Sequence, residues 1–146
     1  MIDPAFIGYE FGLHHREVEK GQLRFFARAI AETNPIYSDE AAARAAGYPS
    51  LPVPPTFLFC LDMDRGNQYD YMDTMGIELG KVLHGEQSFR YYGMAFADDT
   101  LSFASRITDI YAKKGGLLEF VVRDTRVHRG NDPIADLRST IIVQHR

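Results

Sequence analysis

The chain has 146 residues, long enough for one domain to bury its own hydrophobic core, and we expect a single domain over residues 1–146. Hydrophobic residues make up 45% and charged residues 25%, as in ordinary soluble globular proteins. The net charge of −4 favours neither nucleic acid nor an anionic membrane as a partner, and no apolar run is long enough to span a bilayer. The start lacks a signal-peptide pattern and the single Cys60 excludes an intrachain disulfide, so we expect a cytoplasmic protein.

The first part of the chain predicts a short strand and two helices. The strand covers residues 12–18. A helix over residues 20–32 has its apolar residues on one face, and Asn34-Pro35 ends it because a residue before proline disfavours the helical region. A second short helix is expected to begin at an N-cap Ser38 and to stop at Gly47.

The pattern then changes from amphipathic helices to a buried helix and strands. A proline-rich connector leads into a helix over residues 56–64, which is apolar on nearly all sides and must be wrapped by other structure. After a polar loop rich in Tyr, Asp and Met, alternating apolar and polar residues predict four strands over residues 87–92, 101–111, 117–126 and 134–143. One buried helix followed by an antiparallel meander predicts an α+β fold with a curled sheet wrapped round that helix.

Residues 31–56, AETNPIYSDEAAARAAGYPSLPVPPT, carry a family resemblance. They resemble the active-site segment of the MaoC-like hydratase/dehydratase family, whose frame is retained in Asn34-Pro35-Ile36, Asp39, Ala43 and Gly47. The later run Leu83-His84-Gly85-Glu86-Gln87 is similar to that of the N-terminal MaoC-like, fatty-acid-synthase-type dehydratase domain subfamily. The resemblance covers most of the chain and implies the hotdog fold, in which a curled antiparallel sheet surrounds one buried helix.

The chemical positions of this segment differ from those of the catalytic members. The family's Asp corresponds to Glu32 and its His to Tyr37, whose hydroxyl is a poor base near pH 7 but can donate a hydrogen bond. Pro55 replaces the glycine whose N–H polarises the thioester carbonyl, and because proline has no N–H, Thr56 would have to supply the donor. If the chain is itself active, Glu32, Tyr37 and the Thr56 amide are the candidates, with Asn34 orienting them.

Other candidate residues lie outside this segment. His84 and Glu86 lie near the start of a strand, where side chains that point in opposite directions would not form a pair. We keep His84 as an alternative acid/base residue. The candidate substrate-binding residues are Pro55, Thr56, Phe57 and Glu86. Tyr69, Tyr71 and Met72 lie in the loop where hotdog proteins often admit the acyl chain, and plain loop packing explains them equally well. No histidine has a second ligand at metal spacing, so we expect no metal.

The resemblance implies reversible hydration of 2-enoyl thioesters, with the substrate carried on CoA or on the phosphopantetheine of acyl carrier protein and with no further cofactor. Because an exposed sheet edge normally finds a partner, we expect a homodimer, or a heterodimer with a catalytic MaoC-like subunit. The first hypothesis is an acyl-chain-binding subunit of a heteromeric hydratase. The alternatives are a self-sufficient homodimeric hydratase with a shifted acid/base set, and a non-catalytic hotdog that only binds thioesters.

Overall fold

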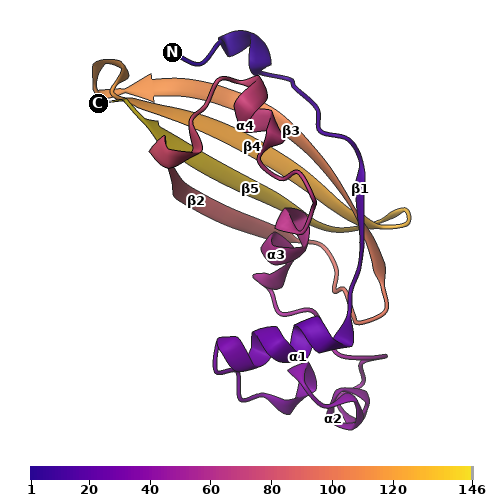
Figure 1. Ribbon diagram of the computed structural model, residues 1–146. Helices are drawn as coiled ribbons and strands as arrows, with labels where there is room; N and C mark the ends of the chain where they lie inside the picture. The colour runs from indigo at the N-terminus through magenta and orange to yellow at the C-terminus, as the bar shows by residue number, and fades with distance from the viewer. Residues whose placement is uncertain (146) are drawn as a thin grey trace.

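A single antiparallel sheet of five strands forms the body of the molecule, and the computed structural model describes residues 1–145 (Figure 1). The strand order is β1-β3-β4-β5-β2. The strands are β1 (His14–Glu17), β2 (Val82–Tyr91), β3 (Thr100–Lys113), β4 (Leu118–Arg129) and β5 (Asp132–Gln144). The helices are α1 (Lys20–Ala29), α2 (Glu40–Ala45), α3 (Phe57–Met63) and α4 (Asp70–Thr74). The predicted α+β arrangement is therefore confirmed.

Helix α3 packs against the curled sheet, as its apolar sequence predicted. Phe57, Leu58 and Leu61 are buried and join Phe103 and Val127 of the sheet in one hydrophobic cluster. A second cluster lies nearer the chain termini, where α4 covers the sheet (Figure 1). It contains Ile2, Tyr71, Met72, Met75, Ile77, Ile107, Val121 and Val143. Among residues 1–145, none of the helices combines the length and apolarity that crossing a bilayer requires.

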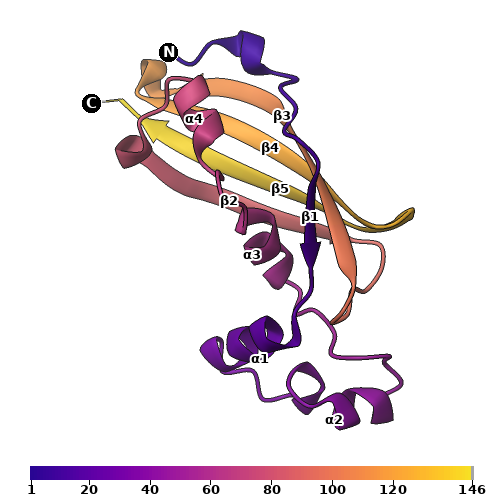
Figure 2. The same ribbon diagram turned by 45° about the vertical axis from the view of Figure 1, so that its right-hand side comes forward.

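Helices α1 and α2 lie beyond the sheet, beside the end of α3 at which that helix begins (Figure 2). The rings of Phe26 on α1 and Phe57 on α3 are 4.9 Å apart and join the two parts. The prediction that α1 runs to residue 32 was wrong. The helix stops at Ala29 because Ala31 adopts a left-handed conformation with φ 54°, and the Glu32 N–H donates to the Ala27 carbonyl at 2.8 Å. This is a Schellman-type ending.

Two other local predictions were also wrong. The N-cap of α2 is Asp39 and not Ser38, because the Asp39 carboxylate accepts hydrogen bonds from the N–H groups of Ala41 and Ala42 at 2.7 and 3.3 Å. The segment predicted as a polar loop contains α4, and β2 begins at Val82 rather than at residue 87. The other three predicted strands are confirmed, with β5 burying Ala135, Leu137 and Val143 on alternate positions as its pattern required.

Candidate functional site

The segment that follows α1 holds three predicted catalytic residues in one tight turn. The Glu32 carboxylate accepts a hydrogen bond from the backbone N–H of Asn34 at 2.8 Å. The Asn34 side-chain oxygen in turn accepts from the N–H of Ile36 at 3.2 Å and caps the short 3-10 helix Pro35–Tyr37. Asn34 therefore shapes the turn that carries Glu32 and Tyr37, and Glu32 lies outside the helix, not in its last turn.

Tyr37 is half-buried beside Glu32, and its environment disfavours the phenolate. Burial raises the pKa of the Tyr37 hydroxyl above its ordinary value, and the nearby Glu32 carboxylate and Tyr48 hydroxyl raise it further. The hydroxyl therefore stays protonated near neutral pH. It can donate a hydrogen bond but cannot serve as a general base there.

The beginning of α3 offers one free backbone donor. Pro55 has no N–H, and the N–H of Phe57 donates to the Pro54 carbonyl oxygen at 2.9 Å. The N–H of Thr56, the N-cap residue, has no acceptor among residues 1–145. Thr56 and Pro55 are exposed, whereas the Phe57 side chain is buried against Phe26 and forms core. Of the predicted substrate-binding residues here, Thr56 has an amide that a thioester carbonyl could reach.

A bulge in β2 separates His84 from Glu86. His84 pairs with Ile141 of β5, but Glu86 pairs with the next residue, Thr140, so the register shifts by one at Gly85. His84 faces α3, where its ring stacks on Phe59 at 5.3 Å. In a regular strand residues two apart share a face, so the bulge itself sends Glu86 to the opposite face.

Glu86 lies near Arg138 on the face of the sheet away from α3; the hydrogen bond to Asp124 is the main cause that raises the pKa of Arg138, and the charge of Glu86 adds to it. No hydrogen bond, ion pair or ring contact joins His84 or Glu86 to the turn of Glu32 and Tyr37 among the residues described.

A cavity of about 240 Å³ lies between α3, the α4 segment and the sheet. His84 and Leu79 border it, Phe59 and Met63 line its α3 side, and Arg123 lines its sheet side. The complete wall is formed by Phe59, Met63, Gln68, Tyr69, Tyr71, Met72, Leu79, Val82, His84, Val121, Arg123, Ser139 and Ile141. Most of these side chains are apolar or aromatic, and a few polar groups converge among them, as in small-molecule pockets generally. Tyr69, Tyr71 and Met72 thus lie beside a cavity and not only in loop packing.

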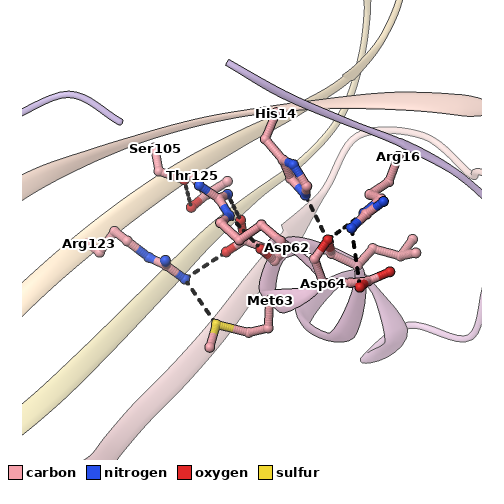
Figure 3. Close-up of polar contacts among 10 residues, drawn as sticks. His14, Arg16, Asp62, Met63, Asp64, Ser105, Arg123 and Thr125 are labelled. Atoms are coloured by element: carbon pink, nitrogen blue, oxygen red, sulfur yellow. Dashed lines mark hydrogen bonds and ion pairs between the residues drawn. The ribbon is translucent and has the colours of Figure 1, made fainter. Parts of the chain in front are cut away.

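A buried ion cluster, not foreseen from the sequence, lies beside this cavity (Figure 3). The Asp62 carboxylate of α3 is 1% exposed and accepts hydrogen bonds from Arg123 at 2.7 Å and from Arg65 at 2.8 Å. Asp62 is thus a buried ion-pair partner and not a solvated carboxylate at a helix end. The available signal was alternation in β4, because Val121, Arg123 and Thr125 occupy every second position and share one face.

A larger hollow of about 580 Å³ lies on the other face of the sheet and is lined by polar side chains of β2 to β5. Its charges compensate one another locally: Arg138 forms a bidentate pair with Asp124 at 2.7 and 2.8 Å, and this pairing lowers the pKa of Asp124. No three His, Cys, Asp or Glu side chains in residues 1–145 cluster closely enough to hold a metal ion. The cavity beside α3 is therefore the better candidate site.

Comparison with known proteins agrees with this fold. A family model described as FAS1-like, dehydratase domain region, matches residues 5–137. A UPF0336 protein of Saccharopolyspora erythraea is 31% identical over 144 residues, which cover 98% of this chain and 92% of that protein.

Two solved structures share the architecture at low sequence identity. A chain of the HadBC (3R-hydroxyacyl-ACP dehydratase) complex of Mycobacterium tuberculosis superposes with a TM-score of 0.79 at 23% identity, covering 94% of this chain and 96% of that one. A MaoC-like dehydratase superposes with a TM-score of 0.83 at 21% identity, covering 96% of this chain and 42% of that one. These structures confirm the predicted hotdog fold. The family model, which matches residues 5–137, shows that the chain belongs to the family of FAS1-like dehydratase domains.

Proposed function

We propose that this chain is the acyl-chain-binding subunit of a heteromeric enzyme that reversibly hydrates 2-enoyl thioesters. The thioester is carried on CoA or on acyl carrier protein, and a MaoC-like partner supplies the Asp/His pair. In the hydration direction the partner adds a hydroxyl to Cβ and a proton to Cα of the enoyl group. This chain holds the acyl part in place while that happens.

The observation that carries the proposal is the position of the cavity along α3. Phe59 and Met63 of α3 border it four residues apart, and Thr56 precedes Phe59 by three, so all three lie along one side of the helix. A thioester carbonyl at the free N–H of Thr56 can therefore extend its acyl chain along this side into the cavity.

Weak acid/base chemistry in this chain supports the need for a catalytic partner. Tyr37 holds its proton near neutral pH because its pKa is raised, so the position of the family's base carries a hydrogen-bond donor instead. Pro55 removes one oxyanion donor. The HadBC structure, named as a complex, supports an assembly of two different hotdog chains.

The sheet also has a free edge for such an assembly. β2 is the last strand in the sheet order, and its residues Leu83 and Tyr91 are exposed, as is Tyr92 just after it. An exposed strand edge with apolar neighbours is a natural pairing site.

A self-sufficient hydratase is the second candidate, and two features favour it: the free N–H of Thr56 and the exposed carboxylate of Glu32. The two are separated by assaying crotonyl-CoA hydration with the chain alone and with a MaoC-like partner that has an intact Asp/His pair. The first proposal expects activity only in the mixture. Activity of the chain alone that is lost in Glu32→Ala and Tyr37→Phe would establish the second and refute the first.

A matched pair of surface variants tests the cavity itself. Leu79 borders the cavity and is 53% exposed, so Leu79→Trp can obstruct it without disturbing the core. Leu117→Trp is the control, because Leu117 is 55% exposed and does not border the cavity. We expect Leu79→Trp to lower kcat/KM of the mixture for long enoyl-CoA more than for crotonyl-CoA, and Leu117→Trp to change neither. Equal effects of the two variants would contradict the proposal.

A further inference from the structure

The ion cluster beside the cavity carries more positive than negative charge. Asp62 is the one carboxylate paired with both Arg65 and Arg123, and the three side chains are only 2%, 11% and 8% exposed, respectively. Arg16 and Asp64 form a separate, more exposed pair and cancel each other. His14 adds no charge near neutral pH, since burial lowers its pKa. One buried positive charge is therefore left without a counter-charge, which is unfavourable in a low-dielectric interior.

The donors of Arg123 that remain open border the cavity. Its Nη2 group donates to Asp62 and lies 3.8 Å from the Met63 sulfur (Figure 3). Its Nε–H and Nη1–H groups have no acceptor among residues 1–145, and Arg123 forms part of the cavity wall. One face of the guanidinium lies over the Phe11 ring, with its central carbon 5.8 Å from the ring centroid, and this contact favours the observed orientation.

Two more polar side chains lie in the same row of the sheet. Ser139 is directly opposite Arg123 in the β4–β5 register and also lines the cavity, and Gln87 is directly opposite Ser139 in β2. The Gln87 side-chain oxygen is buried and has no partner. Because the oxygen and nitrogen of an amide are interchangeable by a flip, Gln87 can also present N–H donors here. The Arg123 guanidinium and the Ser139 hydroxyl form a polar row in a largely apolar cavity wall, and Gln87 lies next to Ser139 in the sheet.

We infer that this cavity selects acyl chains that carry a carboxylate at the end remote from the thioester. The carboxylate accepts hydrogen bonds from Arg123 and Ser139 and neutralises the surplus charge, while Phe59, Met63 and Met72 contact the methylene chain. From Thr56 to Met63 the helix rises about 10 Å, so the chain has to be of medium length to reach Arg123. This inference rests on the proposed function, because it assumes that the thioester lies at Thr56.

The test is calorimetric binding of matched CoA thioesters to the full chain, alone and with its catalytic partner. Octanoyl-CoA is compared with suberyl-CoA, and decanoyl-CoA with sebacyl-CoA; in each second member a carboxylate replaces the terminal methyl group. We expect the carboxylate-bearing member of at least one pair to bind about 10- to 100-fold more tightly, the effect of a buried charge-assisted hydrogen bond. Equal affinities in both pairs, or tighter binding of both unsubstituted chains, overturn the inference.

Two variants assign the preference to this row. Arg123→Lys keeps the positive charge that Asp62 requires but loses the planar fork, and Ser139→Ala removes one hydroxyl without touching an ion pair. Each should reduce the preference, measured as the ratio of the two affinities within one pair of thioesters, at least several-fold. A preference that survives in both variants contradicts the assignment.

The two levels of the argument fail in different ways. If unsubstituted thioesters bind, Leu79→Trp weakens that binding, and the carboxylate-bearing thioesters bind no more tightly, then the cavity binds acyl chains and only the inference is wrong. If no thioester binds and Leu79→Trp has no effect on the mixture, the proposed function is wrong as well.

Discussion

The Asp62 carboxylate should be the most costly single side chain to remove from this fold. Asp62→Leu leaves Arg65 and Arg123, both largely buried, without the carboxylate with which they pair. Removing one partner of a buried ion pair typically costs about 3–5 kcal/mol of unfolding free energy. Arg123→Met should cost less, about 2 kcal/mol, because Asp62 then retains its 2.8 Å contact with Arg65. The asymmetry arises because one anion serves two cations.

The double variant Asp62→Leu with Arg123→Met completes a thermodynamic cycle. It replaces two charges by apolar groups and leaves only Arg65, which at 11% exposure is the more exposed of the two arginines. We expect its cost to be smaller than the sum of the two single costs by about 1–3 kcal/mol. The measurement is urea unfolding at one fixed protein concentration, since association would add to apparent stability. A larger cost for Arg123→Met than for Asp62→Leu, or additive costs, would refute the reasoning.

Three further predictions concern stability at separate sites. Burial lowers the pKa of His14, so the unfolded chain takes up this proton first and stability should be lost as pH falls below about 6.5; urea midpoints should show a smaller loss in His14→Gln. Ala31→Gly should stabilise the protein by about 1 kcal/mol because Ala31 has φ 54°, whereas Ala29→Gly, inside α1, should destabilise it by a similar amount; equal signs would contradict this. Gly85→Ala should cost about 1–3 kcal/mol because its Cβ would lie 2.8 Å from Ile142, and Gly12→Ala, with open space around it, should be nearly neutral; thermal melting compares the two.

Regular elements of this fold could be predicted where the side-chain period was unambiguous. β5 alternates buried and exposed residues from Ala135 to Ser139, and α1 begins where its apolar face begins. Errors arose where two residue types suit one position, as with Ser38 and Asp39, both good N-caps. The end of α1 was missed because Ala31 adopts a conformation that sequence rules assign to glycine. Only the hydrogen bonds of the folded turn compensate for it.

The candidate site was half predictable, for a physical reason. The turn of Glu32, Asn34 and Tyr37 is local in sequence, so its residues could be named from one segment. The cavity is built from α3, the α4 segment and three strands, and its polar wall requires Asp62 to meet Arg123 from 61 positions away. In a single sequence, the only signs of such a pairing are a charged residue on the buried face of a strand, Arg123, and a charged residue within an apolar helix, Asp62.

The position of this ion pair also accounts for a cavity at this point in the core. Along β4, Val121 belongs to the hydrophobic cluster beneath α4, and Val127 belongs to the cluster beneath α3. Arg123 lies between them, with Thr125 and Ser105 joined by a 2.8 Å hydrogen bond on its other side. Apolar side chains gain nothing by packing onto a guanidinium whose N–H groups still need acceptors, so the two clusters do not close over it. An occupant with an oxygen-bearing end satisfies those donors and fills the space, which a purely aliphatic chain cannot do.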